Sequence, residues 1–185
     1  MRKVVLYSLL SMDGVAEHPD QYILDWDDAM DAHLARVIES QDAVLLGRGS
    51  YDDWAPFWPT SEIQPFADFI NGVEKYVFTS TPPAEPWAKT TVVGTDAVEF
   101  VRELKTQPGR DIGLHASINL SRSLLTAGLV DEMRLVIAPT VAGRGRRLFP
   151  DAAETQRWRL VDVEGTSSGA VLAHYSGKLA HLSGE

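Results

Sequence analysis

The sequence contains no cysteine. Disulfide bonds, thiolate catalysis and metal sites built from cysteine are therefore excluded. The sequence also lacks any apolar run close to the roughly 18 residues that a membrane-spanning helix needs. Its start, MRKVVLYSLLSMDG, has a basic pair and a short apolar run, but the run meets Asp13 without a small-residue cleavage site. Such a start is a poor signal peptide, so we expect a soluble, cytoplasmic protein.

Positive charge is scarce as well. The 185 residues include 17 lysines and arginines against 26 aspartates and glutamates, which gives a net charge of −9. Nucleic acids and anionic membranes are poor partners for such a chain, and we expect neither. Hydrophobic residues make up 44% of the chain, enough for a substantial core. We expect a single domain over residues 1–177 and a C-terminal tail over residues 178–185.

A strand–helix–strand unit stands out between Asp111 and Pro139, in DIGLHASINLSRSLLTAGLVDEMRLVIAP. A short strand leads into the turn His115-Ala116-Ser117, where Ser117 is predicted to cap a helix. Gly128 stands where a left-handed glycine commonly ends a helix, and a second strand follows. The helix start is either an anion site or only part of a packed crossover, and the local pattern leaves both open.

The remaining periodicity predicts an α/β fold. The expected architecture has three layers: a mixed, mostly parallel central sheet, helices on both faces, and an antiparallel C-terminal hairpin. We expect strands at 4–10, 43–46, 75–78, 91–93, 112–114 and 133–138, helices at 25–41 and 96–105 besides the crossover helix, and hairpin strands at 158–164 and 171–176.

Turns of small residues follow three predicted strands, at Gly47, Thr79 and His115. Carboxyl ends of neighbouring parallel strands meet at one edge of a sheet, where α/β proteins bind ligands. If these strands are neighbours, the turns line one edge and suit an extended, phosphate-bearing ligand, to which Arg48 adds positive charge. The sequence lacks both the GxGxxG fingerprint and the Lys-Ser/Thr of a P-loop.

Two acids are candidate ligand-binding residues, and each also has a purely structural explanation. Asp13, in the turn after the first strand, either contacts a ligand or hydrogen-bonds the turn backbone, and the second is commoner. Asp31 lies on the margin of the apolar stripe of its helix. There it either faces a cleft, with a raised pKa, or is one more solvated acid near the helix start.

An aromatic cluster and a basic cluster are further candidates for ligand binding, and each has a structural alternative. The segment 51–59, which includes Trp54, either walls a pocket for a flat heterocycle or is a local hydrophobic plug. Arg144, Arg146 and Arg147 form the one basic cluster in the sequence. They either clamp a substrate phosphate or belong to a solvated loop.

The order of several short motifs resembles the dihydrofolate reductase-like superfamily. The nearest branch is the reductase domain of the bifunctional riboflavin-biosynthesis deaminase-reductase, with its stand-alone relatives. The matching motifs are Ser11-Met12-Asp13-Gly14, Leu46-Gly47-Arg48-Gly49-Ser50-Tyr51, Val77-Phe78-Thr79-Ser80-Thr81, Gly128-Leu129-Val130-Asp131-Glu132, and Ala138-Pro139 followed by Gly143-Arg144-Gly145 and Leu148-Phe149.

This resemblance implies an NADPH-dependent reductase and no metal. The turns after the second and third strands would hold the adenosine end of the cofactor, and the turn before the crossover helix would hold its pyrophosphate. By this carry-over the cofactor-binding positions are Gly47, Arg48, Ser50, Thr79, Ser80, Thr81, His115, Ala116, Ser117, Ile118 and Asn119. Trp26 and Asp31 have the spacing of a tryptophan and an acid that lie at the pterin in dihydrofolate reductases.

The expected reaction is hydride transfer to a small heterocyclic or ribosylamino-pyrimidine substrate, similar to that of 5-amino-6-(5-phosphoribosylamino)uracil reductase. Asp31 would orient the substrate or assist its protonation. Contacts to the substrate are expected from Asp13, Trp26, Trp54, Arg146 and Arg147. The alternatives are a dihydrofolate or other pteridine reductase, a reductase of xenobiotic carbonyl compounds, and a non-catalytic nucleotide-binding relative.

Two departures from the family pattern bear on the cofactor. His115-Ala116 replaces a Gly-Gly pair, so a Cβ hinders close backbone approach, although His115 could itself hydrogen-bond a phosphate. The turn Thr79-Ser80-Thr81 has no basic residue for a 2′-phosphate, and Arg48 is the obvious substitute. The apolar edge of the C-terminal hairpin predicts a homodimer, since family members often pair there.

Overall fold

The computed structural model describes residues 1–149 and 155–177, so the predicted tail, 178–185, lies outside the described residues. Its strands are β1 (Val4–Leu10), β2 (Gln41–Gly47), β3 (Glu74–Phe78), β4 (Thr90–Val93), β5 (Asp111–His115), β6 (Glu132–Ile137), β7 (Arg159–Gly165) and β8 (Val171–Ser176). Its helices are α1 (Asp28–Glu39), α2 (Arg48–Trp54), α3 (Phe66–Gly72), α4 (Ala97–Thr106) and α5 (Ile118–Thr126), with 3-10 turns η1 (Pro19–Gln21) and η2 (Trp58–Thr60).

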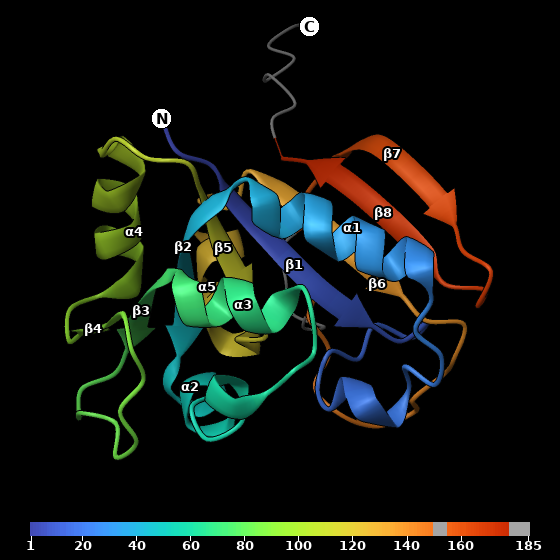
Figure 1. Cartoon of the computed structure of the whole chain (residues 1–185). Helices are drawn as coiled ribbons and strands as arrows, with labels where there is room; N and C mark the ends of the chain where they lie inside the picture. Colours follow the sequence, from blue (N-terminus) through green and yellow to red (C-terminus); the bar gives the residue numbers. More distant parts are fainter. Residues whose placement is uncertain (150–154, 178–185) are drawn as a thin grey trace, which may run out of the picture.

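The described strands form one eight-stranded sheet in the order β4-β3-β2-β5-β1-β6-β8-β7 (Figure 1). The first six strands in this order run parallel, while β8 pairs antiparallel with β6 and β7 antiparallel with β8. The predicted fold class, a mostly parallel sheet with an antiparallel C-terminal hairpin, is therefore confirmed. Among the helices of the described residues, none is both long and apolar enough to cross a bilayer.

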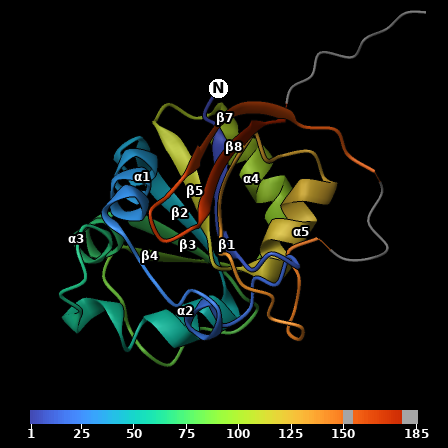
Figure 2. The same ribbon diagram turned by 90° about the vertical axis from the view of Figure 1, so that its right-hand side faces the viewer.

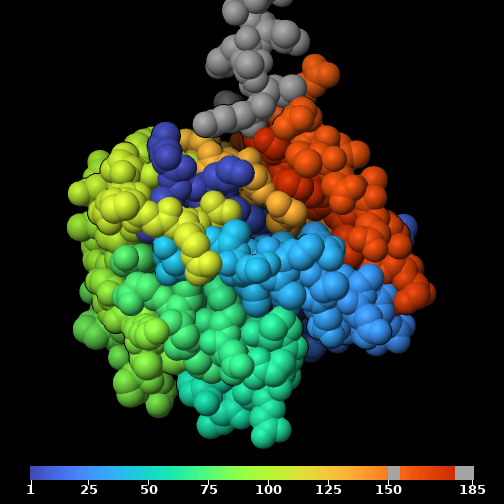
Figure 3. Space-filling model, turned by 45° about the horizontal axis from the view of Figure 1, so that its top comes forward, coloured from blue at the N-terminus to red at the C-terminus, as the bar shows by residue number. Residues whose placement is uncertain are grey.

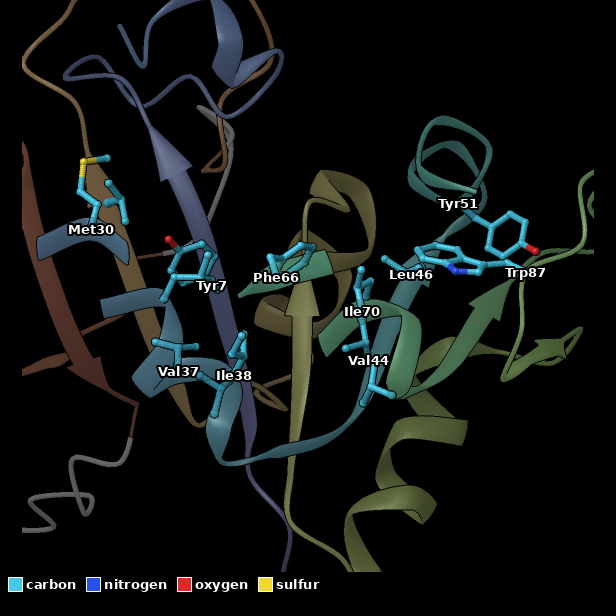
Figure 4. Packing of buried hydrophobic residues seen from close by; sticks show 14 of the residues in the cluster. Tyr7, Met30, Val37, Ile38, Val44, Leu46, Tyr51, Phe66, Ile70 and Trp87 are labelled. Carbon is cyan, nitrogen blue, oxygen red and sulfur yellow. The ribbon is translucent and has the colours of Figure 1, made fainter. Parts of the chain in front are cut away.

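Helices cover both faces of the sheet. Seen edge-on, α1 and α3 lie on one face and α4 and α5 on the other (Figure 2). On the first face, Val37 of α1, Ile70 of α3 and Val44 of β2 belong to one core cluster, in which Ile70 lies beside Val44 (Figure 4). All three are buried, and burying each such side chain contributes about 1.5–3 kcal/mol. The sheet is thus the middle of three layers, as the sequence predicts.

Helix α1 begins at Asp28, three residues later than the periodicity predicts. Asp27 has extended backbone, and its carboxylate accepts a hydrogen bond from the Met30 N–H at 3.0 Å, which is the geometry of an N-cap. The same carboxylate accepts from the Ser168 N–H at 2.9 Å, so it ties α1 to the β7–β8 turn. Figure 3 shows α1 lying between the C-terminal hairpin and α3. The hydrogen bond from Ser168 lowers the pKa of Asp27 well below its ordinary range.

Helix α3 is absent from the predicted elements. It spans Phe66–Gly72, too short for a clear helical period. Its burial of Phe66 and Ile70 against α1 and the sheet holds it in place. Tertiary packing, which a local pattern does not contain, decides this helix.

The end of α5 follows the prediction. Gly128 has a φ of 66°, a conformation that glycine adopts without strain. The N–H groups of Gly128 and Leu129 donate to the carbonyls of Leu125 and Leu124, at 3.1 and 2.9 Å. These bonds satisfy carbonyls that the helix leaves free. Leu129 is buried against the second core, which fixes where the chain enters β6.

The hairpin forms one edge of the sheet. Leu160, Val161 and Val163 of β7 are exposed, with relative accessibilities of 45–53%. Exposed apolar side chains on an unpaired edge strand are unfavourable for a lone chain. The homodimer expected from the sequence stays a prediction.

Candidate functional site

The three small-residue turns meet at one edge of the sheet. Strand β2 pairs with β3 on one side and with β5 on the other, all parallel. The turns after these strands therefore lie side by side at their carboxyl ends (lower part of Figure 1). This confirms the neighbour relationship on which the predicted ligand edge depends.

A cavity of about 830 Å³ opens beside this edge. Its walls come from β1, the segment 16–20, the start of α1, α2, the segment 58–66, the turn 115–117 with α5, and the segment 146–148. We call two sets of its lining residues the turn group (Ser50, Ala116, Ser117, Ile118 and Asn119) and the loop group (Glu17, Trp26, Asp31 and Arg146). The volume suits a drug-sized ligand or larger.

Ser117 links the turns of β2 and β5. Its hydroxyl accepts a hydrogen bond from the Gly47 N–H and donates one to Ser50 Oγ, both at 2.9 Å. Ser117 occupies the predicted N-cap position of α5, but its side chain makes no capping hydrogen bond to the helix. The first N–H groups of a helix lack partners within it. In α5 they remain available to an anion, which the positive end of the helix dipole favours.

Ala116 lies in the left-handed region with a φ of 56°. A non-glycine residue adopts this conformation at a cost of about 1–2 kcal/mol. Its side chain is exposed and lines the cavity. Alanine thus adopts here a backbone conformation that glycine would adopt freely.

His115 belongs to the cavity wall, but its ring is packed in the core. It is buried against Tyr7 and Phe66, and its Nε2 lies 2.8 Å from Gln41 Oε1. This pair lies over Gly113, where a Cβ would be 2.7 Å from His115 Nε2. Burial lowers the pKa of His115 to about 3, so the ring is neutral at ordinary pH. The predicted hydrogen bond from this side chain to a phosphate is wrong, because the ring is committed to the core.

Arg48 connects α2 to the turn after β3. Its guanidinium donates to the Thr81 carbonyl at 2.9 Å, to Thr81 Oγ1 at 3.0 Å and to Thr79 Oγ1 at 3.4 Å. It also pairs with Asp52 one turn along α2, at 2.7 Å. The cation that the Thr79-Ser80-Thr81 turn lacks is therefore brought to it by Arg48.

Trp26 and Asp31 form a direct pair. The indole Nε1–H donates to Asp31 Oδ1 at 2.6 Å. Both side chains line the cavity, so Asp31 faces a cleft. It is also exposed to solvent, as the other expected alternative states. The indole holds one Asp31 oxygen, and the other has no partner among the described residues.

Tyr7 lies beside this pair and was not expected there, because β1 reads as an apolar strand. It is buried and lines the cavity, and its hydroxyl has no hydrogen-bond partner in the described part of the chain. Burial, and to a lesser extent the Asp31 carboxylate, raise the pKa of Tyr7. A buried hydroxyl without a partner costs free energy, so it is a neutral donor that a ligand could satisfy.

Asp13 hydrogen-bonds backbone. Its carboxylate accepts from Ser11 Oγ at 2.6 Å and from the N–H groups of Ala142 and Gly143, both at 2.9 Å. Arg147 also serves this loop, since its Nε donates to the Asp13 carbonyl at 2.9 Å. Neither Asp13 nor Arg147 lines the cavity. The predicted substrate contacts from these two residues are corrected to a structural role that joins two loops.

The other predicted residues divide into two sets. Trp54 and Arg146 line the cavity with Trp26 and Asp31, as do Ser50 and residues 115–119. Beyond the cavity wall, but beside it at the sheet edge, lie Gly47, Arg48, Thr79, Ser80 and Thr81. Asp53 and Trp58 line the cavity from the segment 51–59, which was expected as a possible pocket wall. Glu17, Asp20 and Phe66 line it without having been predicted, and they come from a loop, the 3-10 turn η1 and α3.

A sheet of this order, with an antiparallel C-terminal hairpin and a cavity at the carboxyl ends of its parallel strands, defines a protein of the dihydrofolate reductase-like fold. The sequence model of one protein family, described as the RibD C-terminal domain, matches residues 2–172. The chain belongs to this family.

Two similar proteins match this chain over nearly their whole lengths. The chain is 31% identical to the uncharacterised protein YyaP of Bacillus subtilis over 187 residues, which cover 95% of this chain and 96% of YyaP. It is 28% identical to the uncharacterised protein YwjB of the same organism over 178 residues, or 94% and 97% of the two chains.

Solved structures support the fold. A putative riboflavin biosynthesis protein of Shewanella superimposes with a TM-score of 0.77 at 17% identity, over 95% of this chain and 99% of that one. A pyrimidine reductase-like protein of Corynebacterium diphtheriae gives 0.66 at 15% identity, over 95% and 91%. A Thermotoga maritima deaminase and 5-amino-6-(5-phosphoribosylamino)uracil reductase gives 0.66 at 17% identity, over 96% of this chain but 57% of that longer chain.

Proposed function

We propose that this protein is an NADPH-dependent reductase that transfers a hydride to a small nitrogen heterocycle or ribosylamino-pyrimidine. The observation that carries the proposal is the meeting of the Ser117-linked turns with the Trp26–Asp31 pair at one cavity. The first set of groups suits phosphates and the second a flat polar ring. Membership of a reductase-domain family supports the same reading.

The turn group, together with Arg48 and the neighbouring turn after β3, fits a dinucleotide. The free N–H groups at the start of α5 would hold the pyrophosphate, because Ser117 leaves them uncapped. Arg48 and the hydroxyls of Thr79 and Thr81 would hold a 2′-phosphate, to which a guanidinium gives charge-assisted hydrogen bonds. When bound, NADPH supplies the hydride from its nicotinamide ring.

The loop group would position the acceptor. Trp26 and Trp54 offer aromatic surface to a flat ring. The free oxygen of Asp31 would accept an N–H of that ring and orient the carbon that is reduced. Asp31 would also guide a proton, directly or through water, to the atom next to that carbon.

Calorimetric titration with NADPH and then NADH tests the cofactor. We expect micromolar binding of NADPH and much weaker binding of NADH. Arg48→Ala should weaken NADPH by about tenfold, since it removes one charge-assisted contact to the 2′-phosphate, and should change NADH less than about twofold. Arg102→Ala, on the exposed side of α4, is the matched control.

The outcomes separate the alternatives. Equal weakening of both nucleotides by Arg48→Ala would remove the 2′-phosphate assignment. No binding of either nucleotide would contradict the reductase proposal. A panel of ribosylaminouracils, dihydrofolate, other pteridines and carbonyl compounds, read by NADPH oxidation, then identifies the acceptor. Tight nucleotide binding without turnover on any acceptor would indicate a non-catalytic relative.

A further inference from the structure

The cavity carries more negative than positive charge. The carboxylates of Glu17, Asp20, Asp31 and Asp53 line it. Among the lining residues within 1–149 and 155–177, Arg146 is the one arginine or lysine. A phosphate monoester brings about two further negative charges at neutral pH, and like charges repel at short range. A phosphorylated substrate would enter this cavity against its charge.

Arg146 is already neutralised. Its Nε donates to Glu17 Oε1 at 2.7 Å, and its backbone N–H donates to Glu17 Oε2 at 3.1 Å. The hydrogen bond from the Arg146 side chain lowers the pKa of Glu17, so the carboxylate is ionised at neutral pH. The pair is partly exposed and its free energy is modest. Unlike Asp52 beside Arg48, however, Glu17 itself lines the cavity, so a substrate phosphate at Arg146 would also meet this carboxylate.

The neighbouring arginines do not compensate. Arg147 points its Nε at the Asp13 carbonyl and forms a backbone bridge to Val15. Arg144 does not line the cavity either. The arginine clamp for a substrate phosphate that the sequence suggests is therefore not assembled here. The remaining feature that favours anions, the start of α5, is taken by the cofactor in the proposed function.

We propose that the substrate of this reductase is a flat heterocycle of the aminopyrimidine type, neutral or cationic, that carries no phosphate. This inference rests on the proposed function and names the substrate class of the same site. The aromatic surface of Trp26 and Trp54 suits a flat ring. The acids that line the cavity accept hydrogen bonds and donate none when ionised. They therefore select ligands whose edges carry N–H groups.

The direct test compares two probes that differ only in a phosphate. Protein saturated with NADP⁺ is titrated with 5-amino-6-ribitylaminouracil and with its 5′-phosphate. We expect the unphosphorylated compound to bind at least about fivefold more tightly, because the phosphate meets unbalanced carboxylates. Tighter binding of the phosphorylated compound would overturn the inference. So would a failure of the unphosphorylated compound to bind.

The variant Glu17→Gln tests whether the Glu17 carboxylate causes the preference for the unphosphorylated compound. The amide keeps an oxygen that can accept from Arg146 but removes the charge that neutralises it. We expect the phosphorylated probe to gain about fivefold in affinity, while the unphosphorylated probe changes less than about twofold. Glu62→Gln, exposed and outside the cavity, should leave both affinities unchanged. An unchanged preference in Glu17→Gln would contradict the assigned role of the Glu17–Arg146 pair.

The inference and the proposed function fail in different ways. The NADPH titration is read before either probe is added. If NADPH binds and the phosphorylated probe is preferred, the substrate class is wrong and the reductase proposal stands. If neither NADPH nor NADH binds, the reductase proposal itself is contradicted.

Discussion

The turn group and the loop group line the same cavity but are built by different means. The turn group consists of small side chains and backbone N–H groups at strand ends, held by hydrogen bonds such as Gly47 N–H to Ser117 Oγ. The loop group consists of large aromatic and charged side chains from segments that lie outside the sheet. The position of the turn group depends on the order of the strands in the sheet. The position of the loop group depends on which loops pack together in the tertiary structure.

This difference separates two kinds of specificity. Backbone groups at the carboxyl ends of parallel strands suit the constant part of a reaction, such as a dinucleotide. Side chains such as Asp31 and Glu17 can change without disturbing the sheet, so under the proposed function they would set which acceptor is reduced. A variant in one group should therefore affect one ligand and spare the other.

The largest expected effect is that of Asp31→Asn. The change keeps the volume and a hydrogen-bond acceptor for Trp26 but removes the negative charge. We expect kcat/KM for the acceptor found in the substrate panel to fall by about 100-fold, or about 2.7 kcal/mol, which is typical of losing a group that assists proton transfer. The Kd for NADPH should change less than about twofold, because the turn group is untouched.

Steady-state kinetics between pH 5 and 8, with calorimetry for NADPH, checks this prediction. Asp28→Asn is the matched control, since Asp28 is exposed on the same helix and outside the cavity. If kcat/KM of Asp31→Asn matched that of the control across this range, the role of Asp31 would be disproved.

The second effect concerns the packing beneath the turn group. In Gly113→Ala the new Cβ would overlap the Gln41 side-chain oxygen and lie 2.7 Å from His115 Nε2. The buried His115–Gln41 hydrogen bond would break, and the free energy of unfolding should fall by about 2 kcal/mol. Urea denaturation measures this loss. Gly72→Ala, where a Cβ meets nothing within 4 Å, should be nearly neutral, and equal stability of the two variants would contradict the packing argument.

The turn group was largely predictable from the sequence. Apolar runs locate the strands, and the small residues after them locate the turns, so Gly47 and Ser117 follow from the pattern alone, whereas Asn119 was expected only from the family resemblance. What the pattern does not give is the direction of a side chain. The Ser117 side chain bonds to the β2 turn and makes no capping hydrogen bond to its helix, and His115 turns into the core because Gly113 leaves room there.

The loop group was predictable in part: Arg146 belongs to the one basic cluster in the sequence, Asp31 lies on the margin of its apolar stripe, and the family spacing added Trp26. Glu17 carries no local signal, because its importance comes from an arginine 129 positions away along the chain. Asp13 shows the reverse, since its motif suggests a ligand contact while its carboxylate caps the distant backbone of Ala142 and Gly143. Pairings between loops depend on tertiary structure, which sequence periodicity does not encode.

The smallest expected effect is that of Ala116→Gly. This variant tests whether having alanine in place of a family glycine at position 116 affects stability or NADPH binding. Glycine would relieve the left-handed strain of about 1 kcal/mol but would add a similar entropy to the unfolded chain. We therefore expect the free energy of unfolding to change by less than about 0.5 kcal/mol. Because the turn already has the backbone conformation that glycine favours, the Kd for NADPH should change less than about twofold.

Ala116→Val provides the contrast, since a β-branched residue fits this conformation poorly and should lose at least about 1 kcal/mol of stability. Urea denaturation and NADPH calorimetry on both variants give the answer. A tenfold gain in NADPH affinity for Ala116→Gly would mean that the alanine Cβ obstructs the pyrophosphate.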